Sequence, residues 1–173
     1  MRETSEDLDR LQAVLDESHA QGGAHLRSII TDERRLSARA IADRLTGMTL
    51  LTLATTTRDG APIAGPVDGI LYRGEFWFGS APNSLRFRHI RKRPRVSATH
   101  LPGEHLGVTV HGTAHIEGVP AALPDEFQSV CVGIYGETWH DWGEEALYAR
   151  IEPRRMFTFH LDQEQTSADE ASA

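Results

Sequence analysis

The sequence predicts a mainly β protein of the α+β class, in which six or seven antiparallel strands close into a small barrel preceded by N-terminal helices. From residue 48 onward the chain is rich in threonine and in apolar residues that favour strands. Two turn-forming dipeptides, Asp59-Gly60 and Arg73-Gly74, separate three such runs. A helical pattern between residues 124 and 147 indicates a late insertion. Closing the sheet would leave no strand edge exposed, which favours a barrel.

The composition is that of a soluble globular protein. The 173 residues are 39% hydrophobic and 25% charged, enough for one domain with a substantial core. No apolar run reaches the length of a membrane span, and the polar, acidic N-terminus does not resemble a secretory signal. We therefore expect a cytoplasmic protein without a membrane partner. The net charge of -7 argues against general nucleic-acid binding. The single cysteine, Cys131, lies in an apolar context that predicts a buried, unreactive thiol.

The first 46 residues are expected to form a helical extension. Residues 4–20 carry leucines at helical spacing, with Ser5 as a possible cap and acids in the first turn. A second helix is predicted within residues 36–47, with Ser37 as its N-cap and Gly47 just past its end. This second segment resembles the first helix of a helix-turn-helix. A strand pattern follows it, however, so no DNA-reading role is predicted.

The barrel is expected over residues 47–162, and the polar, acidic residues 163–173 predict a disordered tail. Strands are predicted at 48–58, 61–72, 75–80, 95–101, 105–118 and 147–161, the last as a strand pair or one bent strand. In the second strand, Gly65, Pro66 and Gly69 predict a bulge or a close backbone approach. Asp125 is a possible cap for the late helical segment.

One short stretch, residues 80–95 (SAPNSLRFRHIRKRPR), concentrates basic charge in this acidic chain. It holds six of the 18 lysines and arginines and no acid. We expect a loop and a short helix that ends near Pro94, because the residue before a proline is disfavoured in a helix. Asn83 is a good N-cap, which would make Ser84, Leu85 and Arg86 the first helical residues.

That helix start fits a single phosphate group. Its free N–H groups, the hydroxyls of Ser80 and Ser84 and the guanidinium of Arg86 are all donors to an anion. The later cations, from Arg88 to Arg95, lie too far along the helix to share the same phosphate. They form a solvated face, bind a second anionic element of a cofactor, or contact an acidic surface of a partner subunit.

The order of these segments resembles the pyridoxamine 5'-phosphate oxidase-like split β-barrel family. The resemblance covers about residues 45 to 160 and rests on TLATTTRDGAPIAGPVDGILYRGEFWFGSAPNSLRFRHIRKRPRVSATH followed by VTVHGTAHIEG. It implies a split β-barrel flavoprotein that binds FMN at the interface of a homodimer. The deazaflavin coenzyme F₄₂₀ is an alternative, and haem, which a smaller set of similar barrels handles, is another. The HGTAHIE strand resembles the segment that reaches across the dimer interface.

The resemblance also implies cofactor-binding residues. The loop and helix start after the third strand would hold the cofactor phosphate, and the backbone of the second strand would approach its ring. The residues at these positions are Ala64, Gly65, Pro66, Val67, Ser80, Asn83, Ser84, Leu85, Arg86 and Arg91. The family more often has lysine where Arg86 stands and asparagine where His89 stands, so the role of His89 stays open.

Two further groups of residues invite a functional interpretation. His111 and His115 share a face of one strand, but no histidine or cysteine spacing matches a zinc site, so no metal is predicted. They are interpreted as polar-face or interface histidines, with a haem ligand as the alternative. Trp139 and Trp142 surround a His-Asp pair. They either pack the insertion against the barrel or form a wall of a substrate pocket that stacks a planar molecule.

Taken together, these features predict an oxidoreductase that transfers hydride between a flavin-type cofactor and an unidentified small molecule. No catalytic residue is predicted, because in such chemistry the cofactor carries the hydride. The alternative is a non-catalytic split barrel that holds flavin or haem as a carrier or sensor.

Overall fold

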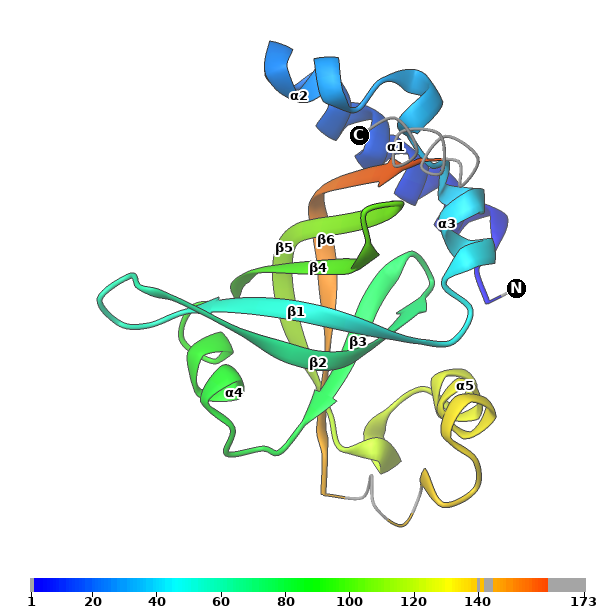
Figure 1. Cartoon of the computed structure of the whole chain (residues 1–173). Coiled ribbons are helices and arrows are strands. Elements are labelled where there is room, and N and C mark those ends of the chain that lie inside the picture. Colours follow the sequence, from blue (N-terminus) through cyan, green and yellow to red (C-terminus); the bar gives the residue numbers. More distant parts are fainter. Residues whose placement is uncertain (1, 140, 142–144, 162–173) are drawn as a thin grey trace.

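A computed structural model describes residues 2–139, 141 and 145–161 of the chain (Figure 1). Within these residues, six antiparallel strands close into a barrel in the order β1-β2-β3-β6-β5-β4. This confirms the expected mainly β barrel. The strands are β1 (Met48–Thr56), β2 (Pro62–Tyr72), β3 (Glu75–Ser80), β4 (Arg95–Gly103), β5 (Leu106–Gly118) and β6 (Leu147–His160). The predicted tail and Trp142 lie outside the described residues.

The β1–β2 hairpin carries the weakened strand that the sequence predicted. Its register is continuous from Met48 opposite Ile70 to Thr56 opposite Pro62, so this described hairpin contains no bulge. The predicted alternative, a close approach to the backbone of this strand, occurs at Gly69. A Cβ on Gly69 would lie 2.4 Å from a methyl carbon of Leu51 inside the barrel. The far end of the hairpin projects beyond the barrel beside the short helix α4 (Leu85–Ile90) (Figure 1).

The last strand, β6, is one bent strand of 14 residues rather than a pair. Its beginning pairs with β3, and most of its length pairs with β5. The register shifts where His111 faces Arg155 and Gly112 faces Pro153, which leaves Arg154 as an extra residue. A bulge of this kind bends a strand and accommodates a proline that cannot donate to the ladder.

Helices precede the barrel (Figure 1). They are α1 (Ser5–Ala20), α2 (Ala24–Ile29), the 3-10 turn η1 (Asp32–Arg34) and α3 (Ala38–Arg44). Among them, α1 packs against β6 and α3 packs against α1. Ser37 caps α3 as expected. The cap of α1 is Thr4 and not Ser5, because Thr4 and Asp7 form a reciprocal capping box. The helix α2 was not expected; among its residues none is buried, so it lacks the apolar pattern that sequence reasoning uses.

Two hydrophobic clusters hold the molecule together. The larger one fills the barrel and includes Leu11, Leu15 and Ile41 from the N-terminal helices. The smaller one lies outside the barrel under α5 (Asp125–Tyr135), where the rings of Trp77 and Phe127 are 4.3 Å apart.

Two predictions concern α5 itself. Cys131 belongs to the smaller cluster and is fully buried, as predicted, and burial raises the pKa of its thiol to about 12. The capping role suggested for Asp125 was wrong. Pro124 occupies the cap position, and Asp125 is the first helical residue.

Candidate functional site

The basic stretch forms a turn followed by α4. The helix cap is Ser84 and not Asn83, since the Ser84 hydroxyl oxygen accepts the backbone N–H of Phe87 at 3.4 Å. A turn in which the Ser84 N–H donates to Ala81 O at 2.9 Å places Asn83 before the helix. The helix therefore begins at Leu85 and has only six residues. Because the dipole of so short a helix is small, the positive charge at its N-terminal end comes mainly from Arg86.

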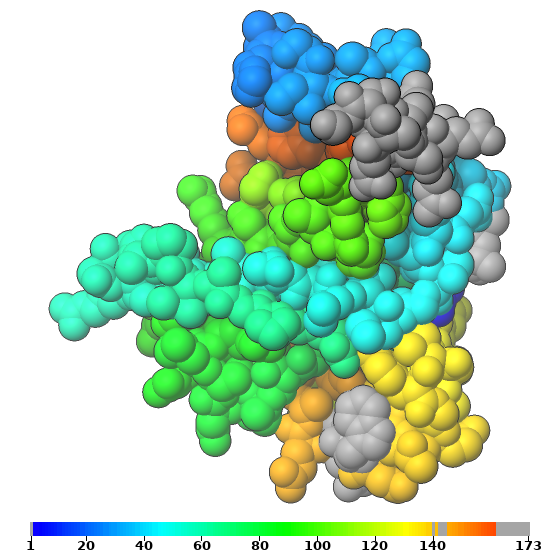
Figure 2. Space-filling view, viewed as in Figure 1, coloured from blue at the N-terminus to red at the C-terminus, as the bar shows by residue number. Residues whose placement is uncertain are grey.

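A depression of about 190 Å³ lies between α4 and the far end of the β1–β2 hairpin. Figure 2 shows these two segments against one another on one side of the molecule. The lining residues are Leu53, Thr55, Ile63, Ala64, Gly65, Ser84, Leu85 and Arg86. Five of the ten residues predicted to bind a cofactor therefore lie together, although they come from segments about twenty residues apart in the sequence.

Arg86 is the charged group of this depression, and it is partly buried. Its Nη2 donates to the carbonyl oxygen of Pro66 at 3.1 Å. A Cβ on Gly65 would lie 3.8 Å from the same nitrogen, at ordinary contact distance, so the guanidinium lies directly beside this glycine. Burial lowers the pKa of Arg86, and no carboxylate among the described residues pairs with it. Several N–H donors of the guanidinium are left over, because Arg has five.

The other predicted residues lie around the depression rather than in it. Pro66 contributes its carbonyl oxygen to Arg86, but the Val67 side chain points into the barrel core and is 4% exposed. Asn83 is exposed in the turn. Arg91 supports that turn from below, since its Nη1 donates to Pro82 O at 3.0 Å.

The later cations divide into two groups. Arg93 is structural, because its Nε donates to Thr56 O at 2.7 Å and ties the end of α4 to β1. Arg88, Lys92 and Arg95 are exposed and make no ion pair with a described residue. They remain available to solvent, to an anionic cofactor or to a partner subunit.

His89, whose role the sequence left open, is buried beneath the depression. It is 7% exposed, and its Nδ1 lies 2.9 Å from the hydroxyl of Thr55. Thr55 itself lines the depression, so the buried histidine holds one of the polar groups of the site. Sequence reasoning missed Thr55 because it read the threonines of β1 only as strand-forming residues.

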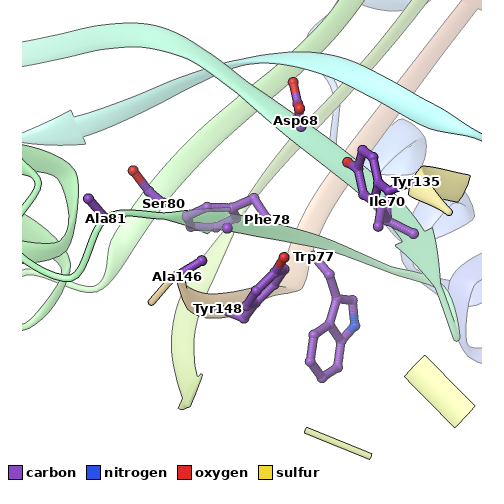
Figure 3. Close-up of a pocket in the computed structure, with 10 residues that line it drawn as sticks. Asp68, Ile70, Trp77, Phe78, Ser80, Ala81, Tyr135, Ala146 and Tyr148 are labelled. Carbon is purple, nitrogen blue, oxygen red and sulfur yellow. The ribbon is translucent and has the colours of Figure 1, made fainter. Parts of the chain in front are cut away.

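A second cavity, of about 160 Å³, lies on the other side of the loop that follows β3 (Figure 3). It is lined by Asp68, Ile70, Trp77, Phe78, Gly79, Ser80, Ala81, Tyr135, Ala146 and Tyr148. Ser80 thus lines this cavity, whereas Ser84 and Arg86 line the first depression. The reason is that Ser80 still belongs to β3, where it pairs with Leu147 of β6.

Trp139 lies behind this second cavity. It is fully buried, and its Nε1 donates to the hydroxyl oxygen of Tyr148 at 2.8 Å. Tyr148 lines the cavity, so Trp139 reaches it only through that ring. Burial raises the pKa of the Tyr135 and Tyr148 hydroxyls, and the negative charge of Asp68 raises both further. Both tyrosines therefore stay protonated near neutral pH.

The two histidines of β5 have separate partners. His111 Nδ1 lies 2.7 Å from the Ser97 hydroxyl, and His115 Nε2 lies 2.7 Å from a carboxylate oxygen of Glu152. In the described part of the chain, no three His, Cys, Asp or Glu side chains gather into a metal site. None of the helices in the described ranges is long and apolar enough to cross a membrane.

Comparison with known proteins agrees with this architecture. Residues 37–168 match a family model described as pyridoxamine 5'-phosphate oxidase. Among solved structures, a conserved hypothetical protein from Mycobacterium tuberculosis is similar, with 24% identity, a TM-score of 0.62 and coverage of 75% of this chain and 88% of that one. No curated protein sequence matches the chain.

Two other similar structures differ in the cofactor that their descriptions name. An FAD-binding protein from Mesorhizobium loti is 22% identical, with a TM-score of 0.53 and coverage of 72% of this chain and 93% of that one. An F₄₂₀ reductase is 16% identical, with a TM-score of 0.50 and coverage of 66% and 94%. At these identities the likeness concerns the fold.

Proposed function

The chain belongs to the pyridoxamine 5'-phosphate oxidase family, and from this premise we propose that it is a flavin-type oxidoreductase. The cofactor we propose is FMN, with its phosphate bound in the depression between α4 and the β1–β2 hairpin. Hydride would pass between this cofactor and a small molecule that is not identified. Two neighbours of the same fold, an FAD-binding protein and an F₄₂₀ reductase, support a cofactor of this class.

The observation that carries the proposal is the state of Arg86. A partly buried guanidinium without a carboxylate partner is unfavourable by itself, and an anion in the depression would compensate its charge. The Ser84 oxygen accepts a bond from the Phe87 N–H, which leaves the hydroxyl hydrogen to donate. One guanidinium and one hydroxyl on the same rim fit one phosphate monoester.

The roles of the chain's own residues follow from their positions. Arg86 and Ser84 would bind the phosphate, and Gly65 lies beside the guanidinium. His89 orients Thr55 at the base of the depression. When bound, FMN would supply the hydride chemistry, and the protein would supply position and electrostatics. We assign no side chain a proton-transfer role.

We further propose that the working form is a homodimer. Leu50 on β1 and Leu101 on β4 are 57% and 67% exposed. They lie on neighbouring strands, two residues beyond the Thr52–Thr99 pair, and His100 Nδ1 lies 3.0 Å from Leu50 O. Large apolar side chains gathered on one face are typical of a protein interface.

The deazaflavin F₄₂₀ is the second candidate, and one observation favours it. Arg88, Lys92 and Arg95 are exposed without ion pairs to described residues, and they would suit a cofactor with a second anionic group. A non-catalytic flavin or haem carrier is the third, and the visible absorption spectrum of the purified protein would identify a bound haem.

The test is a titration of the purified protein with FMN, in which binding is measured by the quenching of flavin fluorescence. F₄₂₀ is titrated in parallel. We expect Arg86→Ala to weaken FMN binding by about 1–3 kcal/mol, as for the loss of a charged hydrogen bond. Arg86→Lys should lose less, because it keeps the charge without the planar fork.

Arg88→Ala is the matched control for the phosphate site, since it removes an exposed arginine of the same helix. FMN binding should be unchanged in this variant. A loss of F₄₂₀ binding in Arg88→Ala, with F₄₂₀ preferred over FMN by the wild type, would select the deazaflavin. Absence of binding to both cofactors would refute the proposed function.

A further inference from the structure

The cavity beneath α5 has the size and the walls of a site for one aromatic ring. A cavity of about 150 Å³ with apolar walls is large enough for benzene, and this one measures about 160 Å³. Because the Phe78 ring packs against Phe87 in the barrel core, the aromatic side chains of the cavity wall are Trp77, Tyr135 and Tyr148. These rings are held firmly: Trp77 packs 4.3 Å from Phe127, and a Cβ on Gly79 would lie 3.0 Å from the Tyr148 ring.

Among the described residues that line this cavity, Asp68 alone is charged, and its charge is negative. Asp68 is exposed on β2 and has no hydrogen bond or ion pair from its carboxylate to a described residue. Figure 3 shows Asp68 at the side of the cavity where Tyr135 lies, with Tyr148 facing them. Electron-rich ring faces and an unpaired carboxylate both attract a cation.

The same strand therefore carries two sites of opposite sign. The Pro66 carbonyl contacts the Arg86 guanidinium, and Asp68 comes two residues later, about 6.6 Å along the strand. An anionic group is favoured at the first position and is repelled at the second. A ligand of the second cavity must therefore differ in charge from a ligand of the first depression.

We propose that this cavity binds a single-ring aromatic molecule that carries a positively charged nitrogen group. The ring lies between the aromatic walls, and the cationic group lies at the rim on the Asp68 carboxylate. The hydroxyl of Tyr148 accepts a hydrogen bond from Trp139 and keeps its own hydrogen, which is directed to a ring substituent that can accept it. Ligands with a carboxylate or phosphate on the ring are disfavoured by Asp68.

As a binding site, the cavity stands independently of any flavin. Its assignment as the substrate site of the oxidoreductase rests on the proposed function. In that case the charge difference along β2 separates the two molecules, with the phosphate of the cofactor at Arg86 and the cationic substrate at Asp68.

The test uses three probes of similar size and different charge: benzamidine, benzyl alcohol and benzoate. Binding to the flavin-free protein is measured by calorimetry and by ligand-detected NMR. We expect benzamidine to bind about tenfold more tightly than benzyl alcohol, and benzoate to bind most weakly. Asp68→Asn should weaken benzamidine about tenfold, to the level of benzyl alcohol, and leave benzyl alcohol unchanged.

Three variants complete the design. Asp125→Asn removes an exposed carboxylate of α5 and should leave all three affinities unchanged. Ala146→Leu places a larger side chain in the cavity and leaves less space, so it should weaken the binding of benzamidine and of benzyl alcohol alike. Arg86→Ala should weaken FMN and leave benzamidine unchanged, so a failure of the flavin proposal and a failure of this one are separable.

The opposite results are equally clear. If benzamidine does not bind, or binds no better than benzoate, the cavity is not a site for a cationic ring. If Asp68→Asn changes the affinities for all three probes equally, the Asp68 charge at the rim does not select the ligand. Either result overturns the inference even where FMN binding behaves as proposed.

Discussion

At the scale of the residue, Gly112 shows how tightly the barrel is packed. It lies on β5 at the register shift with β6, and a Cβ there would lie 2.1 Å from the carbonyl oxygen of Glu152. The obstacle is backbone, which cannot rotate away as a side chain can.

We predict that Gly112→Ala lowers the free energy of unfolding by more than about 2 kcal/mol, because β5 and β6 must separate to admit the methyl group. Gly107→Ala is the matched control on the same strand. Its nearest neighbours would be at 3.6 and 3.9 Å, which is ordinary contact, so it should change stability by less than about 0.5 kcal/mol. Urea denaturation of the two variants makes the comparison, and equal losses would contradict it.

Arg86 shows what sequence reasoning can locate in the candidate site, and the serines show what it cannot. A basic residue in the first turn of a helix, after a loop of small residues, is a local pattern, so its place beside the second strand was predictable from the resemblance. Whether Ser80 and Ser84 face the same space depends on the path of the loop between them. Ser80 remains in β3, paired with Leu147 of β6, whereas Ser84 caps α4, and this separates their hydroxyls.

At the scale of the element, the start of α1 is an electrostatic unit. The side chains of Thr4 and Asp7 each accept a hydrogen bond from the backbone N–H of the other residue. Arg10 forms an ion pair with the Asp7 carboxylate. Burial by itself raises the pKa of Asp7, but the two bonds from Thr4 and the charge of Arg10 outweigh it. The pKa of Asp7 therefore lies below the usual aspartate value.

A group whose pKa is lower in the folded state stabilises the fold when it is ionised. We predict that Asp7→Asn lowers the free energy of unfolding by about 1 kcal/mol near neutral pH. The difference in unfolding free energy between variant and wild type has its full value above pH about 3.9, the pKa of an aspartate in the unfolded chain. It disappears as the pH falls through the lower pKa that Asp7 has in the folded protein. Chemical denaturation at several pH values measures it. Asp9→Asn, which removes an exposed carboxylate of the same helix, should have a smaller effect near neutral pH.

The elements differed in how well the sequence predicted them. The first three strands were predictable because two turn-forming dipeptides separate them from one another. The single course of β6 was not, because Glu152-Pro153-Arg154 reads as a turn when the strand opposite is unknown. The bulge opposite Gly112 accommodates this proline within the strand. The helix α2 has no buried face, so it left no pattern to detect.

At the scale of the whole molecule, the exposed leucines of β1 and β4 bear on assembly. In the proposed homodimer, Leu101 would be buried against the second subunit. We predict that Leu101→Glu raises the dimer dissociation constant about 100-fold or more, because a charge would be buried without a partner. Light scattering on a dilution series measures this. Ile29→Glu, at a 44% exposed position of α2, is the control and should remain dimeric; an unchanged Leu101→Glu assembly would place the interface elsewhere.

The strand order has a consequence for the newborn chain. β6 is the last of the described strands in chain order, yet it lies between β3 and β5, and its Met156 N–H donates to the Ser18 hydroxyl oxygen of the first helix at 2.9 Å. A nascent chain that stops before residue 147 has both of those neighbours with unpaired edges, which are the surfaces that aggregate. The barrel therefore cannot close until residues 147–160 are available to pair with both neighbours.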